Sequence, residues 1–300
     1  MNTIIITGGA GFIGTLLTDA LIKKGYRVVV LDRSPSRIQN TQVISHVCDL
    51  TTDDTLPIEL FEGAFAIINL AGTPIFGRFI KKYKQSIYDS RIKTLENIYT
   101  TLTHVTHKPQ KLISASAVGY YGKTNGNLAH EETIPGTDFL ATVCVDWEAY
   151  ALKYKELGLR VSIIRTANVI GKGGLFAVLK KLFKNYVGGY FGNGTQHMPW
   201  IAAPDLVNAY ITLLENERDG IYNVSAGNIT QKELMKNISK ATYKTFVWRI
   251  PRIFGYILYG TFVDVLLMDI EVDNKKLLDS GFVLTEPDLF QYLRTLEKEA

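Results

Sequence analysis

The chain has 300 residues, of which 46% are hydrophobic and 21% charged; 33 basic and 29 acidic residues give a net charge of +4. This length permits one or two domains with a large apolar core. Nucleic-acid-binding proteins usually concentrate positive charge on one face. The two dense basic stretches here, 78–84 and 180–184, alternate with apolar or aromatic residues, as the solvated face of a helix does. We therefore expect no nucleic-acid partner.

The sequence also argues against a membrane protein. Residues 1–8 lack the basic segment of a signal peptide, and their apolar run breaks at Gly8. The most apolar later stretch, 254–268, is too short for a transmembrane helix and is interrupted by Asp264 and two glycines. We expect a buried or partner-facing helix there, in a cytoplasmic monomer or homodimer without a membrane partner. A minor alternative is a membrane-surface reductase that uses residues 252–268.

Apolar strands and amphipathic helices alternate over the first half of the chain. The predicted strands are 3–7, 27–31, 43–47, 64–70, 111–114 and 161–164, and the predicted helices are 12–24, 78–106 and 139–157. This alternation predicts an α/β fold of the Rossmann type, a doubly wound parallel sheet with helices on both faces. We expect residues 1–170 to form this domain, and residues 171–300 to form a smaller substrate-binding lobe packed on it within a single subunit.

A glycine-rich turn lies between the first predicted strand and the first predicted helix, where Gly8, Gly11 and Gly14 have the spacing G-x-x-G-x-x-G. Gly8 permits a tight turn, Gly11 lets a pyrophosphate approach the backbone, and Gly14 lets the helix pack against the strand. The helix N-terminus, with Phe12 and Ile13, presents free N–H groups to the phosphates. The motif predicts binding of NAD or NADP; the alternative is a turn without a ligand.

The end of the second predicted strand bears on the choice of cofactor. A carboxylate at Asp32 accepts a hydrogen bond from the adenosine ribose 2′-OH and favours NAD, whereas Arg33 can pair with a 2′-phosphate and favours NADP. Ser34 adds a hydroxyl donor. The alternative role for Asp32 is a simple cap at the strand end.

The chain resembles the extended and atypical short-chain dehydrogenase/reductases, in particular their epimerase family branch, over nearly its whole length. The residues that carry the resemblance are 7–14, 69–72, 90–91, 114–122, 144–148, 165–166, 192–196, 199–201 and Asp205. The resemblance implies that Leu70, Ala71 and Gly72 line the adenosine side of the cofactor, and that Arg91 and Val169 approach it. The family commonly has a small polar residue where this chain has Asp32. With Arg33, the resemblance makes NADP the expected cofactor and NAD the alternative.

The usual catalytic residues of this superfamily are a Ser or Thr, a Tyr and a Lys, in which the Tyr transfers the proton and the Lys lowers its pKa. Ser116 matches the serine position. The tyrosine and lysine positions fall near Leu140 and Cys144, and neither side chain can do the expected chemistry. The resemblance implies that this branch generally lacks the Tyr–Lys pair. Tyr150 and Tyr154 lie too far along the chain to replace it.

Ser116 and Tyr120 are the candidate catalytic donors that remain, each with a structural alternative: a strand-end hydroxyl for Ser116 and aromatic packing for Tyr120. Asp146 and Glu148 point to different faces of a predicted helix, where solvated or capping roles are expected. The five histidines show no metal-binding spacing, so no metal is expected. His197, in the substrate-side loop, is the one histidine that merits a test.

Two hypotheses of function follow. The first is an NAD(P)-dependent oxidoreductase or epimerase-like enzyme acting on a small carbonyl, alcohol or sugar-nucleotide-like substrate. The second is a non-catalytic NADP(H)-binding sensor or scaffold. The missing Tyr–Lys pair favours the second hypothesis, and the apparently intact substrate lobe, with Gln196, Trp200 and Asp205, favours the first.

Overall fold

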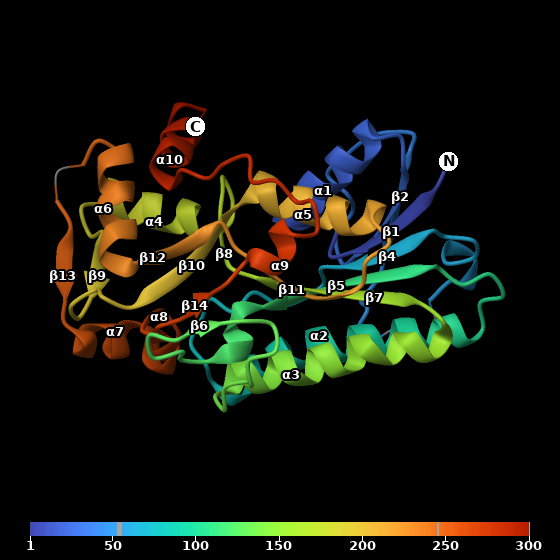
Figure 1. Ribbon diagram of the computed structural model, residues 1–300, viewed down its shortest axis with the longest axis horizontal. Coiled ribbons are helices and arrows are strands. Elements are labelled where there is room, and N and C mark those ends of the chain that lie inside the picture. Colours follow the sequence, from blue (N-terminus) through green and yellow to red (C-terminus); the bar gives the residue numbers. More distant parts are fainter. Residues whose placement is uncertain (53–55, 245, 300) are drawn as a thin grey trace.

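A computed structural model describes residues 1–52, 56–244 and 246–299. Its centre is a seven-stranded sheet in the order β11-β7-β5-β4-β1-β2-β3 (Figure 1). All neighbouring strands in it are parallel. The strands are β1 (Thr3–Thr7), β2 (Arg27–Asp32), β3 (Val43–Val47), β4 (Ala66–Asn69), β5 (Lys111–Ala117), β7 (Arg160–Thr166) and β11 (Gly220–Val224). The predicted Rossmann-type α/β fold is therefore confirmed.

Helices cover both faces of this sheet. On one face lie α1 (Phe12–Lys23) and α5 (Ala203–Glu215), and on the other lie α2 (Lys81–Thr103) and α3 (Phe139–Leu152). Successive side chains of β1 pack alternately against the helices on the two faces of the sheet, because side chains along a strand point to opposite faces. Ile4 and Ile6 pack in the core with Leu17 of α1, whereas Ile5 packs in the core with Leu95 of α2. Both faces of β1 are thus buried.

A second lobe lies at the carboxyl ends of the strands of the central sheet (Figure 1). Its strands form a three-stranded sheet, β12-β10-β8, and the pairs β13-β9 and β14-β6. The strand bounds are β6 (Leu128–Ala129), β8 (Asn168–Ile170), β9 (Gly189–Phe191), β10 (His197–Ala202), β12 (Gly227–Thr230), β13 (Trp248–Ile250) and β14 (Glu271–Val272). The helices are α4 (Gly174–Lys184), α6 (Gln231–Ala241), α7 (Arg252–Tyr259), α8 (Val263–Leu266), α9 (Lys275–Leu278) and α10 (Leu289–Lys298). The division at residue 170 stays a prediction, while β11 and α5, from beyond that residue, belong to the central sheet and its helical layer.

Two helical segments differ from their predicted form. The stretch 139–157 is α3 followed by a 3-10 helix, η3 (Lys153–Leu157). The stretch 254–268 falls in α7, the 3-10 helix η4 (Gly260–Phe262) and α8. Gly260 has φ +59°, a conformation that interrupts a helix. Further 3-10 helices are η1 (Ile58–Leu60) and η2 (Val118–Tyr121). Within the described ranges, no helix is both long and apolar enough to cross a bilayer.

Candidate functional site

The glycine turn joins β1 to α1 at the carboxyl edge of the central sheet. Gly8 has φ +71°, and its carbonyl accepts a 3.1 Å hydrogen bond from the Gly11 N–H. A Cβ on Gly14 would lie 2.4 Å from the Gly8 oxygen, so this glycine is needed for the helix to pack against the turn. Gly11 is the N-cap of α1, and the Gly8 oxygen, at 3.1 Å, is the one close neighbour that a Cβ there would meet. The open side of the turn is therefore at Gly11.

A cavity of about 1150 Å³ lies against this turn. Ten of the twelve predicted cofactor residues line it: Gly8, Gly11, Phe12, Ile13, Gly14, Asp32, Arg33, Leu70, Ala71 and Gly72. They come from three separate stretches of the chain, 8–14, 32–33 and 70–72, which the parallel sheet brings to one edge. Ser34 and Arg37 also line the cavity. Arg37 was missed by the sequence analysis, although its position four residues after Arg33 was a usable signal.

The Asp32 carboxylate holds the glycine turn in place. One of its oxygens accepts a 3.0 Å hydrogen bond from the Ala10 N–H, and the other accepts one of 3.2 Å from the Ser34 N–H. These bonds give Asp32 the capping role that was the alternative in the sequence analysis. Each carboxylate oxygen keeps a further lone pair that can face the cavity. Asp32 therefore has acceptor capacity left for a ligand hydroxyl.

A second cavity, of about 320 Å³, lies between the central sheet and the second lobe. Its lining is mainly apolar: Ile75, Phe76, Ile87, Val118, Leu140, Val143, Trp147, Met198, Pro199, Phe262, Val265, Leu266, Met268 and Ile270 belong to it. The other two predicted cofactor residues, Arg91 and Val169, line this cavity and not the first. Neighbouring residues line the two cavities: Gly72 lines the first and Arg91 the second, and a Cβ on Gly72 would lie 3.1 Å from the Arg91 Cζ.

Leu140 and Cys144 both line the second cavity. Burial raises the pKa of the Cys144 thiol to about 12, so the thiol stays protonated near neutral pH. The buried Tyr154, in η3, donates its hydroxyl proton to the Leu95 carbonyl of α2 at 2.6 Å and does not line the cavity. The residues at the expected tyrosine and lysine positions thus offer no acid near neutral pH.

Arg91 is a cationic side chain in the lining of the second cavity. Its guanidinium lies 5.0 Å from the centre of the Trp147 ring and donates hydrogen bonds to the carbonyls of Thr73 and Ile87, at 3.1 and 3.0 Å. Burial lowers the pKa of Arg91. These contacts fix the guanidinium in one orientation next to Gly72, which lines the first cavity.

Ser116 and Tyr120 belong to a buried network around Arg165. The Ser116 hydroxyl donates to the Glu148 carboxylate at 2.6 Å, and Arg165 donates two hydrogen bonds to the same carboxylate, at 2.9 and 2.8 Å. The Arg165 guanidinium also lies 3.5 Å from the centre of the Tyr120 ring and donates to the Tyr121 hydroxyl. Neither Ser116 nor Tyr120 lines either cavity. The expectation that Glu148 is solvated or capping is wrong, since it is buried and paired.

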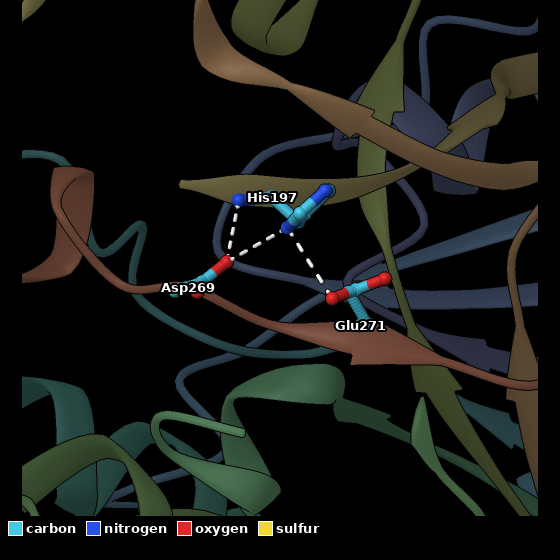
Figure 2. Close-up of side chains that lie close together, drawn as sticks. All are labelled: His197, Asp269 and Glu271. Carbon is cyan, nitrogen blue, oxygen red and sulfur yellow. Dashed lines mark hydrogen bonds and ion pairs between the residues drawn. The ribbon is translucent and has the colours of Figure 1, made fainter. Parts of the chain in front are cut away.

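His197 lines the second cavity at the start of β10, opposite the segment that leads into β14. Its Nδ1 lies 3.1 Å from Asp269 and 3.3 Å from Glu271, and its backbone N–H donates to Asp269 at 2.7 Å. Figure 2 shows both carboxylates on the Nδ1 side of the ring, with the other ring nitrogen pointing away from them. The three side chains also lie close enough together to hold a metal ion. The carboxylates, 72 and 74 residues further on, were missed because they carry no local signal.

The parallel sheet, the glycine turn and the cavity at its carboxyl edge are the architecture of the short-chain dehydrogenase/reductase fold. Residues 4–225 match the model of the NAD dependent epimerase/dehydratase family, and the chain belongs to that family.

Similar proteins are called epimerase family proteins. The chain is 30% identical to one from Staphylococcus saprophyticus over 96% of this chain and 97% of that protein. It is 34% identical to the chloroplastic SDR39U1 homologue of Arabidopsis thaliana over 75% of this chain but 66% of the plant protein. The crystal structure of human SDR39U1 with NADPH shares the fold, with a TM-score of 0.85 at 24% identity over 99% of this chain and all of the human chain.

Proposed function

We propose that the protein binds NADP(H) in the first cavity and transfers hydride between this cofactor and a small, mainly apolar carbonyl or alcohol in the second. The observation that carries the proposal is that two neighbouring residues, Gly72 and Arg91, line the two cavities. A nicotinamide that reaches Arg91 and Val169 from the glycine turn would stand next to the apolar cavity. Hydride transfer requires this proximity of cofactor and substrate.

The residues of the first cavity fit a dinucleotide. The N–H groups at the start of α1 would hold the pyrophosphate, because a Cβ is absent at Gly11 and the helix dipole favours negative charge there. Arg33 and Arg37 both line the adenosine side of the cavity and would pair with a 2′-phosphate. Four cationic side chains that line this cavity, Arg33, Arg37, Lys81 and Lys82, face three carboxylates, Asp32, Asp49 and Asp89. The Asp32 carboxylate is already engaged by backbone N–H groups. NADP(H) is also the cofactor in the structure of the human relative.

The second cavity supports an apolar carbonyl or alcohol better than a sugar nucleotide. A nucleotide sugar brings a diphosphate, which needs cations or several free N–H groups. Among the arginines and lysines that the structure describes, Arg91 lines this cavity, and backbone carbonyls and a tryptophan ring already engage it. Apolar side chains supply most of the remaining surface, so affinity there would come from burial of an apolar substrate.

Three side chains are candidates for the proton donor. Ser116 and Tyr120 stay the predicted donors, but the Ser116 proton points at Glu148, and it would have to change partner to reach a substrate. His197 is a third candidate, because it lines the cavity and its outer ring nitrogen points away from both carboxylates. Histidine is the side chain that most often exchanges a proton near neutral pH.

The test is oxidation of NADPH, followed by absorbance, with a panel of apolar ketones and aldehydes and a panel of sugar nucleotides. Turnover of an apolar carbonyl is expected. Loss of one positioned donor typically lowers the rate about a hundredfold. The variants Ser116→Ala, Tyr120→Phe and His197→Asn identify the donor, with the exposed His104→Asn as a matched control. If NADPH binds and neither panel is turned over, the protein is the non-catalytic NADP(H)-binding sensor or scaffold instead.

A further inference from the structure

Helix α7 turns an apolar face to solvent. Gly255 is its buried contact point: a Cβ there would lie 2.3 Å from Val263 and 3.0 Å from the Phe191 ring. Residues two positions before and after lie on the opposite side of a helix, and these are Ile253 and Ile257. They are 66% and 62% exposed, and Phe254 beside them is 54% exposed. Three large apolar side chains of this eight-residue helix are thus mainly exposed to solvent.

Aromatic residues extend this surface along β13. Trp248 is 59% exposed and donates from its indole N–H to the carbonyl of Tyr186, which is 62% exposed. The Tyr186 ring stacks on Phe246, with 5.2 Å between ring centres, and Lys244 Nζ lies 4.4 Å from the centre of the same Tyr186 ring. Figure 1 shows α7, β9 and β13 together at the end of the molecule remote from β2. We call α7, residue 186 and β13 the distal surface.

Basic residues predominate in the two segments that contain the distal surface, although two of them, Lys172 and Lys180, form ion pairs with Glu299 and Glu297. Residues 171–204 contain four lysines and no acidic residue, and residues 234–263 contain five basic residues and no acidic residue. Nine basic residues in these two segments exceed the net charge of +4, so the rest of the chain is net negative. Lys184 and Arg252 are exposed, and neither forms an ion pair with any residue that the structure describes.

We propose that the distal surface docks on the headgroup region of an anionic lipid bilayer. Exposed Ile and Phe side chains gain free energy by entering the acyl boundary, Trp and Tyr prefer the interface, and Lys and Arg pair with anionic headgroups. A second copy of the chain fits the distal surface less well than an anionic bilayer does, because a symmetric contact would bring two basic surfaces together. A nucleic acid would leave the isoleucines of α7 unburied.

Docking would also hold the apolar cavity near the bilayer. η4 and α8 follow α7 directly, and Phe262, Val265 and Leu266 line the second cavity. The docking proposal does not depend on the proposed hydride transfer. It differs from the sequence-based expectation that the protein has no membrane partner. It supports the alternative in which residues 252–268 meet a membrane surface, now with residue 186 and β13 included.

The experiment uses the intrinsic fluorescence of the full chain. Of the three tryptophans, Trp147 and Trp200 are buried, so Trp248 reports on the distal surface. The protein is titrated with vesicles of acyl-brominated phosphatidylcholine, alone and mixed equimolar with phosphatidylglycerol. We expect quenching by the anionic vesicles, weakened by salt. Each basic residue near the surface contributes about fivefold to affinity, so Lys184→Gln with Arg252→Gln is expected to weaken binding about 25-fold.

Apolar variants complete the test. Ile253→Ser with Ile257→Ser is expected to weaken binding at least tenfold, because two exposed side chains no longer enter the acyl boundary. Ile134→Ser with Val283→Ser, which are 82% and 73% exposed elsewhere, is the matched control and is expected to bind as the unaltered protein does. Absence of quenching by anionic vesicles would overturn the proposal. The proposal would also be overturned if sedimentation velocity showed that the unaltered protein is a dimer and that the Ile253→Ser, Ile257→Ser variant is a monomer. The distal surface would then bind a second copy of the chain.

Discussion

A substitution at Gly11 is expected to weaken cofactor binding while leaving the fold nearly unchanged. The Gly11 φ of −71° and ψ of 178° suit any L-residue, and a Cβ there would meet one close atom, the Gly8 oxygen at 3.1 Å. Gly11→Val is therefore expected to fold with a loss of about 1 kcal/mol or less. Gly14→Ala is the contrast, because its Cβ would lie 2.4 Å from the same oxygen and would disrupt the packing of α1.

The added side chain at Gly11 would occupy the place of the pyrophosphate. Two charge-assisted hydrogen bonds from the helix N-terminus, each contributing about 1.5 kcal/mol or more, would be lost. This loss of about 3 kcal/mol corresponds to NADPH binding about a hundredfold weaker. The affinity of Gly11→Ala for NADPH should lie between those of the unaltered protein and of Gly11→Val. Calorimetry measures the affinity, and the melting temperature without nucleotide reports on the fold. A folded Gly11→Val protein with unchanged affinity would refute the assignment of the site.

Three further predictions concern single side chains. Arg33→Ala is expected to weaken NADP binding about tenfold while NAD binding is nearly unchanged, because NADP alone carries a 2′-phosphate; an equal loss for both would contradict this. Glu148→Gln leaves Arg165 buried and unpaired, which costs about 3–5 kcal/mol and should lower Tm by about 10 °C; an unchanged Tm would show that the pair stabilises little. The raised pKa of Cys144, about 12, leaves about one thiolate in 10⁴ at pH 8. In a Cys48→Ala protein, alkylation should therefore be about a thousandfold slower than for a model thiol and should accelerate with rising pH; rapid alkylation at pH 8 would contradict the buried, protonated thiol.

The parts of the fold that could be predicted are those determined by residues close together in the sequence. The run 3–7 and the glycine spacing after it predicted β1, the turn and α1, because strand, turn and helix signals there are contiguous. The position of Asp32 at the edge of the first cavity followed from the same logic, since the carboxyl ends of parallel strands meet at one edge. The position of Leu70 there was implied by the family resemblance.

The parts that sequence did not predict depend on contacts between distant residues. Glu148 looked like a solvated helix residue because its buried partner, Arg165, lies on β7. His197 and Asp269 are 72 residues apart and meet only when the segment before β14 packs against β10. The break of the 254–268 segment at Gly260 depends on a backbone conformation that glycine permits but does not require.

The central claim is that a cofactor at the glycine turn reaches the apolar cavity. A crystal structure of the protein with NADPH tests it most directly. The account predicts the pyrophosphate at the N–H groups of residues 11–14, the 2′-phosphate at Arg33 or Arg37, and the nicotinamide beside Arg91 and Val169 at the mouth of the second cavity. A nicotinamide that lies in solvent, away from Arg91, would contradict it.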